Sequence, residues 1–341
     1  MGVKIKDLLE GVIHDITLGS LGGKDIAIDA MNALYQFLSI IRQPDGTPLL
    51  DSQKRITSHL SGLFYRNINL LEEKIRPIYV FDGEPPKLKY ETIKERKHVR
   101  ETATEKWLDA LERGDFEDAR KFAQASSRFT EEMISDGKTL LSYMGIPYVQ
   151  APSEGEAQAA HMVRKGEIWS VGSQDQDSLL FGSDRLVRNL TITGRRKLPR
   201  KSTYIEVTPE LISLKEVLKH LEITREQLID IGILVGTDFN EGVKGIGPKT
   251  ALKLIKKHGN LEAVAKEKGV FEEISIDQIR AIFLEPEVTD NYSMKWTSPD
   301  RDKIFEFLCE DHDFSQNRVE RALDRLEKVT DGKQATLFKW M

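Results

Sequence analysis

Three short apolar runs along the chain each lead to an aspartate. The runs 25–28, 77–81 and 168–172 are β-prone, and a helical pattern over 30–41 follows the first of them. The acids after the runs are Asp29, Asp82, Asp175 and Asp177. This order of elements predicts an α/β fold whose central, mostly parallel sheet is flanked by helices. Because open α/β sheets gather ligand groups outside the carboxyl ends of their strands, we expect these acids to converge.

Three further acids complete a set of seven: Glu154, Glu156 and Asp238. Each acid taken alone has a structural explanation. Ser153 and Glu156 have the spacing of a capping box for a predicted helix over 154–165, and the strand-end aspartates could be a helix cap and a turn residue. A cap or a turn has no need to recur at one edge of one sheet, however. The complete set therefore favours a metal site.

A cluster of acids is tolerated at neutral pH only through protonation or through the binding of hard cations. Mg²⁺ prefers oxygen ligands, Mn²⁺ can substitute for it, and seven acids are too many for one octahedral ion, so two ions are implied. Two ions about 4 Å apart would stabilise the attacking and leaving oxygens of a displacement at phosphorus. Zinc is disfavoured because Cys309 is the only cysteine and the histidines are scattered. The chemistry indicated is phosphodiester hydrolysis.

Six short motifs occur in order along nearly the whole chain. They are Ile28-Asp29-Ala30, Phe81-Asp82-Gly83-Glu84-Pro85-Pro86, Ala151-Pro152-Ser153-Glu154-Gly155-Glu156-Ala157, Asp175-Gln176-Asp177, Gly236-Thr237-Asp238 and Gly245-Ile246-Gly247-Pro248-Lys249. The series resembles that of the flap endonucleases, the structure-specific 5′ nucleases of the XPG-like family. The resemblance implies a PIN-like nuclease core and cleavage of DNA 5′ flaps near the junction of single strand and duplex, in Okazaki fragment maturation and base excision repair. A 5′–3′ exonuclease activity could accompany it.

The resemblance also assigns the acids to two Mg²⁺ ions, directly or through water. The first ion would take Asp29, Asp82, Glu154 and Glu156, and the second Asp175, Asp177 and Asp238. We expect one nuclease domain over 1–330, with an N-terminal region over 1–100 and an internal region over 140–260. A tail over 331–341 would follow.

Length and composition allow such an enzyme. The 341 residues, 39% of them hydrophobic, can bury a substantial core, and one cysteine fits a reducing interior. No run approaches the roughly 20 apolar residues of a membrane span, and the amino terminus lacks the pattern of a signal peptide. We therefore expect a cytoplasmic monomer with no membrane partner. The formal net charge of −5 argues at first against a nucleic-acid partner, but basic patches act locally.

Two such patches lack acids altogether. The first spans 185–201 and is predicted to form a β-hairpin that turns near Thr193-Gly194. The second spans 244–257 and contains Lys244, Lys249, Lys253, Lys256 and Lys257. Either could be no more than a solvated face. In the second, however, a Gly-rich turn opens a helix that starts with Pro248, so backbone N–H groups and Lys249 can face a phosphate.

This Gly-rich turn resembles the helix-two-turn-helix of the family, at about 236–258. The resemblance implies that the element binds the duplex backbone. The side chains involved would be Lys244, Lys249, Thr250 and Lys253. The carbonyl groups of Val243 and Ile246 could hold a K⁺ ion.

Residues 87–130 form a charged, helix-favouring segment with few large apolar residues. Lys89, Arg96 and Arg100 fall on one face if 87–111 is helical, and this cationic stripe could hold the scissile phosphate. The segment resembles the family's helical arch, in which Lys89 and Arg96 would steer the phosphate. In the family an aromatic residue at the position of Tyr35 stacks on a nucleobase, although Tyr35 could equally be a core residue. We expect the arch to be mobile without DNA because it has little apolar surface to bury.

Two more regions carry predictions from the resemblance. A loop over 44–48 and a helix over 56–65 correspond to the wedge that bends the duplex. The residues near the DNA strands would be Arg42, Thr57 and Arg66.

After the turn-prone Asp331-Gly332, the chain ends in a pattern that resembles the binding box for a sliding clamp (PCNA). The anchors would be Gln334, Leu337, Trp340 and Met341, the last in place of an aromatic residue. A frayed tail is the alternative. No basic extension follows the box, so the chain resembles archaeal more than eukaryotic members of the family.

Two other functions compete with flap cleavage. A 5′ exonuclease or a bubble-cutting repair nuclease would use the same chemistry, whereas a non-catalytic scaffold would bind junctions and the clamp without cutting. The presence of all seven acids disfavours the scaffold. A Mg²⁺-dependent cleavage assay on flap, nicked and bubble substrates separates these functions.

Overall fold

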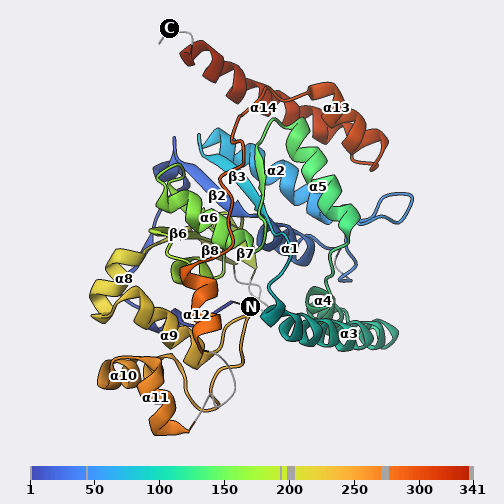
Figure 1. Ribbon diagram of the computed structural model, residues 1–341. Helices are drawn as coiled ribbons and strands as arrows, with labels where there is room; N and C mark the ends of the chain where they lie inside the picture. Colours follow the sequence, from blue (N-terminus) through green and yellow to red (C-terminus); the bar gives the residue numbers. More distant parts are fainter. Residues whose placement is uncertain (1, 44, 193, 198–203, 270–275, 338–341) are drawn as a thin grey trace.

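The computed structural model describes residues 2–43, 45–192, 194–197, 204–269 and 276–337. A seven-stranded sheet lies at the centre, with strand order β1-β9-β6-β5-β2-β3-β4 (Figure 1). The strands are β1 (Ile13–Asp15), β2 (Asp25–Asp29), β3 (Arg76–Phe81), β4 (Tyr148–Gln150), β5 (Ser170–Gly172), β6 (Arg185–Arg188) and β9 (Glu210–Ser213). The strands from β6 to β4 are parallel, and β9 runs antiparallel between β6 and β1. The predicted α/β fold with a mostly parallel sheet is therefore confirmed.

Helices cover both faces of the sheet. They are α1 (Ala30–Ile40), α2 (Ser58–Glu72), α5 (Glu131–Tyr143), α6 (Gly155–Arg164), α7 (Asp177–Leu180), α8 (Leu214–Leu221), α9 (Arg225–Val235), α10 (Pro248–His258), α11 (Leu261–Lys268), α12 (Ile276–Leu284), α13 (Arg301–Phe305) and α14 (Gln316–Leu337), with short helices η1 (Lys6–Leu8), η2 (Leu18–Leu21) and η4 (Glu306–Glu310). Because strand side chains alternate between faces, Ile26 and Ile28 pack with α1, α2, α5 and α14, whereas Ala27 packs with α6, α7 and α9. None of the described helices is long and apolar enough to cross a bilayer.

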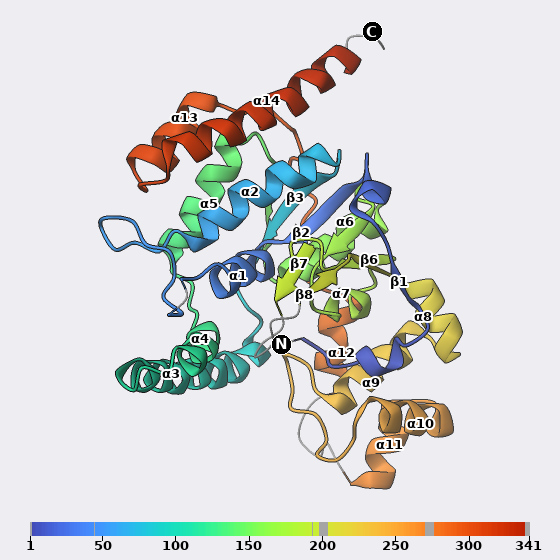
Figure 2. The same ribbon diagram turned by 180° about the vertical axis from the view of Figure 1, so that it is seen from behind.

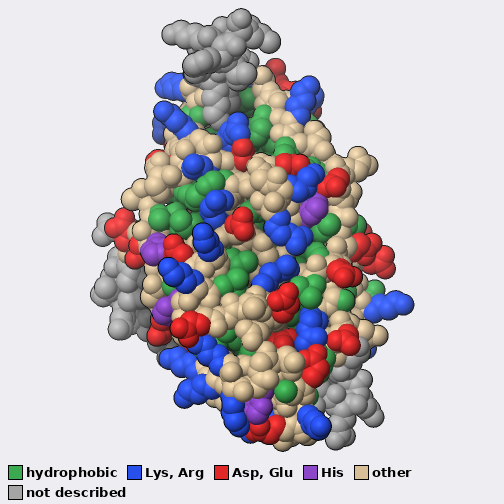
Figure 3. Space-filling model, turned by 60° about the vertical axis from the view of Figure 1, so that its left-hand side comes forward, with side chains coloured by type: hydrophobic (Ala, Val, Ile, Leu, Met, Phe, Trp, Pro, Cys, Tyr) green, Lys and Arg blue, Asp and Glu red, His purple; other side chains and the backbone are tan. Residues whose placement is uncertain are grey.

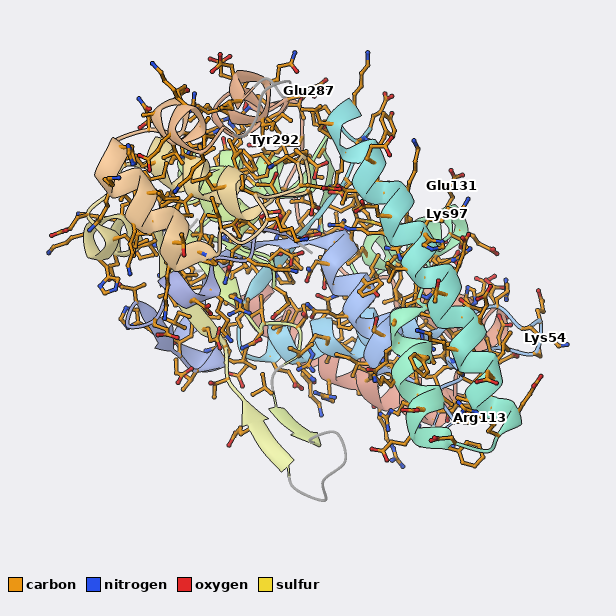
Figure 4. All side chains as sticks on the ribbon, turned by 90° about the horizontal axis from the view of Figure 1, so that it is seen from below. Lys54, Lys97, Arg113, Glu131, Glu287 and Tyr292 are labelled. Atoms are coloured by element: carbon orange, nitrogen blue, oxygen red, sulfur yellow. The ribbon has the colours of Figure 1, made fainter. Side chains whose placement is uncertain are left out.

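A pair of helices projects from this body (Figures 1 and 2). It consists of α3 (Tyr90–Glu112) and α4 (Phe116–Ala125), and the short helix η3 (Lys87–Lys89) leads into α3, so the helix predicted over 87–111 is confirmed with nearly the same ends. The buried residues of α3 and α4 are all alanines. Lys97 lies in the first half of α3 and Arg113 at its far end (Figure 4). We call this pair the arch; its expected mobility stays a prediction.

The predicted hairpin that turns near Thr193-Gly194 is wrong. β6 pairs with β5 and β9 inside the central sheet, and the hairpin is formed by β7 (Gly194–Lys197) and β8 (Tyr204–Val207). This hairpin projects away from the sheet (Figure 4). Arg188 also donates to Glu210 Oε2 at 2.7 Å, so one basic residue of the predicted patch joins two strands of the sheet. On the face in Figure 3, basic and acidic side chains are interspersed.

Three local expectations also differ from the structure. The capping box of α6 is not formed, because Ser153 Oγ donates to the Glu84 carbonyl oxygen at 3.0 Å and Glu154 takes the N-cap position. The helix predicted over 56–65 begins at Ser58 and runs to Glu72. No turn interrupts the chain at 331–332, since α14 continues to Leu337. Trp340 and Met341 of the predicted clamp box lie outside the described residues.

Candidate active site

The sheet brings the strand-end acids together. Asp29 ends β2, Asp82 follows β3, and the doublet Asp175 and Asp177 follows β5, which is parallel to β2. The backbone N–H of Gly155 donates to Asp82 Oδ1 at 2.7 Å. This bond holds the first turn of α6, with its two glutamates, beside the end of β3.

Electrostatic coupling between the acids reflects the same proximity. Burial raises the pKa of Asp29 to about 8, and the neighbouring Asp82 carboxylate adds to the rise. Burial raises the pKa of Asp177 to about 7, with repulsion from Asp238 as the next cause. Burial and the carboxylate of Asp177 raise the pKa of Glu156 well above its ordinary value. Acids from distant parts of the sequence therefore form one cluster.

The arch contributes cations to this cluster. Lys89 Nζ donates to Glu154 Oε2 at 2.5 Å and lies 3.8 Å from Asp238 Oδ2, and Arg96 forms an ion pair with Asp238. Burial alone would lower the pKa of Lys89, but the carboxylates of Glu154 and Asp82 raise it above its ordinary value. The structure therefore joins two members of the predicted cationic stripe to the acids, whereas Arg100 is a half-buried residue further along α3.

Two residues of the cluster were missed by the sequence analysis. The backbone N–H of Gly2 donates to Asp238 Oδ1 at 3.3 Å. A Cβ on Gly2, whose φ is +64°, would lie 2.9 Å from Asp175 Cβ. Asn32 donates to Asp29 Oδ1 through its backbone N–H at 3.0 Å and to Asp175 Oδ2 through its side-chain amide at 3.1 Å. The position of Asn32 three residues after Asp29 is a cap signal, but no pattern indicated Gly2.

The donor set fits a hard divalent cation. It consists of carboxylate oxygens, and the buried Glu156 Oε1 has no hydrogen-bond partner in the described structure. A finished ligand shell is nevertheless absent, because no group of three or more acidic, histidine or cysteine side chains in the described ranges is arranged to hold a metal ion. Lys89 and Arg96 contact two of the oxygens instead.

The predicted helix-two-turn-helix element, at about 236–258, consists of the connection 236–247 and α10, and α9 precedes it. Pro248 begins α10 as expected, and the backbone N–H of Ile246 donates to the Val243 carbonyl oxygen at 3.0 Å. The candidate DNA-contacting side chains of this element are all exposed: Lys244, Lys249, Thr250 and Lys253. Asp238 lies in the same connection, so the element is continuous with the acid cluster.

The remaining predicted DNA contacts are less exposed. Arg42 donates to the Gly46 carbonyl oxygen at 2.7 Å and to Ser127 Oγ at 2.6 Å, so it joins the end of α1 to the segment after α4. Thr57 is buried before α2, and burial lowers the pKa of Arg66. Tyr35 is half-buried, with its ring centroid 6.3 Å from that of Phe129, so it lies outside the fully buried core.

Comparison with known proteins agrees with this arrangement. The XPG N-terminal domain matches residues 1–103 and the XPG I-region matches residues 145–238. The chain is 56% identical to flap endonuclease 1 of Pyrococcus furiosus, over 100% of this chain and 99% of that one, and 54% identical to flap endonuclease 1 of Methanosarcina acetivorans, over 100% of both. The structure of flap endonuclease-1 from Methanococcus jannaschii superposes with a TM-score of 0.76 at 47% identity, covering 97% of this chain and 100% of that one. The catalytic core of Rad2 in complex with DNA substrate superposes with a TM-score of 0.71 at 26% identity, covering 96% and 100%. The chain therefore belongs to the flap endonuclease family.

Proposed function

We propose that this protein is a structure-specific endonuclease that hydrolyses DNA 5′ flaps near the junction of single strand and duplex. The single observation that carries the proposal is the acid cluster beneath the base of the arch, contacted by Lys89 and Arg96. Full-length relatives named flap endonuclease 1 support it. A role in replication and repair follows from the substrate.

The seven acids are the proposed ligands of two Mg²⁺ ions, for which Mn²⁺ could substitute. One set would be Asp29, Asp82, Glu154 and Glu156, and the other Asp175, Asp177 and Asp238. When bound, the ions would supply Lewis-acid stabilisation of the charge that develops on the phosphate oxygens. The high pKa values of Asp29 and Asp177 support this assignment, since these groups favour a compensating cation when they ionise.

The basic side chains position the phosphodiester. Lys89 and Arg96 already lie within contact distance of the acids, so a phosphate that enters between them meets donors as well as carboxylates. Tyr35, in the middle of the helix α1 that follows Asp29, would stack on a nucleobase, and Arg100 would contact the DNA strand along α3. Arg42, Thr57 and Arg66 would line the junction. Arg42 would first have to break its hydrogen bond to Ser127 Oγ.

The exposed end of α10 binds the duplex backbone in this proposal. The contacting side chains would be Lys244, Lys249, Thr250 and Lys253. A K⁺ ion held by the carbonyl groups of Val243 and Ile246 would add charge at the same place; the Val243 carbonyl also accepts a hydrogen bond, which leaves it a second lone pair.

A sliding clamp is the proposed protein partner of the tail over 331–341. Gln334 and Leu337 would begin the binding box, and Trp340 with Met341 would complete it. We propose that the nuclease domain over 1–330 acts as a monomer. A 5′–3′ exonuclease activity would use the same acids on a nicked duplex.

Cleavage of one double-flap DNA, with and without Mg²⁺, tests the function. We expect Mg²⁺-dependent release of the flap, and we expect Asp177→Asn to abolish turnover while DNA binding persists. Equal turnover of the variant would remove the metal assignment. Faster cleavage of a nicked or bubble substrate than of the flap would favour the exonuclease or repair-nuclease alternatives.

A further inference from the structure

Three polar side chains form a line of hydrogen bonds behind Asp175. Asn32 Nδ2 donates to Asp175 Oδ2 at 3.1 Å, and Gln36 Nε2 donates to Asn32 Oδ1 at 2.7 Å. Thr191 Oγ1 donates to Gln36 Oε1 at 2.7 Å. Asn32 and Gln36 are one turn apart on the same face of α1, the helix next to the sheet in Figure 2, while Thr191 follows β6. Asp175 is the only acid in this line, and Asn32 is the residue through which the line reaches the acid cluster.

The donor and acceptor of every bond in the line follow from the carboxylate of Asp175, where the line ends. An ionised carboxylate only accepts hydrogen bonds, so Asn32 must turn its NH₂ group to Asp175 and its carbonyl oxygen to Gln36. Gln36 must then present its own NH₂ group to Asn32, which leaves its oxygen for the hydroxyl of Thr191. The backbone N–H of Gln174 also donates to Asn32 Oδ1, at 3.4 Å, and favours the same orientation.

Asn32 contacts both halves of the acid cluster. Its backbone N–H donates to Asp29 Oδ1, and its side chain donates to Asp175 Oδ2. In the proposed function these two aspartates serve different ions. The far end of the line is protected from water, because Thr191 is 6% exposed and lines a small cavity together with Asn32.

We propose that Asn32 is a positioning residue that fixes the spacing of Asp29 and Asp175, and that Gln36 and Thr191 hold its side chain in place. The inference rests on the proposed metal-dependent function. A carboxylate held through one oxygen presents the other in a fixed direction. The side chain then loses less conformational entropy when a cation binds. Without the hydroxyl of Thr191, Gln36 Oε1 loses its donor, so the Gln36 amide holds Asn32 Oδ1 less firmly and the contact between Asn32 and Asp175 loosens.

The readout is therefore the affinity for a divalent cation in the absence of DNA. Titration calorimetry of the full-length protein with Mn²⁺ should show dissociation constants about tenfold higher for Asn32→Ala and Thr191→Val than for the wild type, as is typical when a group that supports a metal ligand is lost. Thr191→Ser keeps the hydroxyl and should restore wild-type affinity. At saturating Mn²⁺ the flap-cleavage rate of Thr191→Val should recover most of its loss, because the acids themselves remain.

Each outcome decides the question. Unchanged Mn²⁺ affinity in Asn32→Ala and Thr191→Val, with a lower melting temperature only, would show a purely structural role and overturn the inference. The same holds if Thr191→Ser behaves like Thr191→Val. Should Thr191→Val fail to fold, Gln36→Met breaks the line at a residue that is less buried than Thr191. A wild-type protein that binds no Mn²⁺ would instead overturn the proposed function, so the two failures are distinguishable.

Discussion

The side chain of His59 should make the fold sensitive to acid. It is fully buried on α2, and neither ring nitrogen has a hydrogen-bond partner in the described part of the chain. Burial, helped by the neighbouring His312, lowers the pKa of His59 from 6.5 to about 3. Between these values the unfolded chain binds a proton that the folded chain does not, so the free energy of unfolding falls as the pH falls through this window. One pKa unit corresponds to about 1.4 kcal/mol, which gives a total loss on the order of 5 kcal/mol, with about 2 kcal/mol of it by pH 5.

Urea unfolding of the wild type and of His59→Leu at pH 7 and pH 5 measures how much His59 contributes to the loss of unfolding free energy. The variant replaces the ring by an apolar side chain, so it should lose about 2 kcal/mol less than the wild type between the two pH values. The acids with raised pKa values titrate with the opposite sign, but they contribute equally to both proteins. His220→Leu, at an exposed position on α8, is the matched control and should follow the wild type. Equal losses in the wild type and His59→Leu would refute the reasoning.

Three further predictions concern the proposed site and tail. Lys89→Ala should slow flap cleavage about 100-fold, because a positioned cation is lost, while DNA affinity in a filter-binding assay stays within a few-fold; a loss confined to affinity would contradict the role. Gly2→Ala should weaken Mn²⁺ binding several-fold in calorimetry, since its Cβ would lie 2.9 Å from Asp175 Cβ, and an unchanged affinity would show that the amino-terminal segment adapts freely. Deletion of 334–341 should leave unassisted cleavage intact and remove stimulation by a sliding clamp, and equal stimulation of the truncated chain would show that the tail is irrelevant.

The strand ends were predictable because they depend on local signals. An apolar run, an acid and a change to helical periodicity mark the edge of a parallel sheet wherever they occur, and β2, β3 and β5 end as the sequence indicates. The arch helix was predictable for a similar reason, since a long stretch of residues with high helix propensity indicates a helix without information about its tertiary contacts.

The pairing of strands could not be predicted in the same way. β6 pairs antiparallel with β9, with Arg188 opposite Glu210. The strand that follows β6 directly in the chain, β7, pairs with β8 instead. Short strands with similar composition fit several registers, and only the packing of the whole sheet selects one. Gly2 was missed for the same reason, because its role depends on where the amino terminus lies in the fold.

The balance of charge at the site explains why the acids alone do not complete a ligand shell. Burial raises the pKa values of Asp29 and Asp177 to about 8 and about 7, although the charge of Lys89 opposes both shifts. Lys89 and Arg96 contact Glu154 and Asp238 from the arch, in which the buried residues of α3 and α4 are all alanines. In the proposed function a divalent ion would take over the acids that these cations contact, which would leave Lys89 and Arg96 to bind a phosphate. We therefore propose that the arch compensates the charge of the acids until metal and substrate are bound.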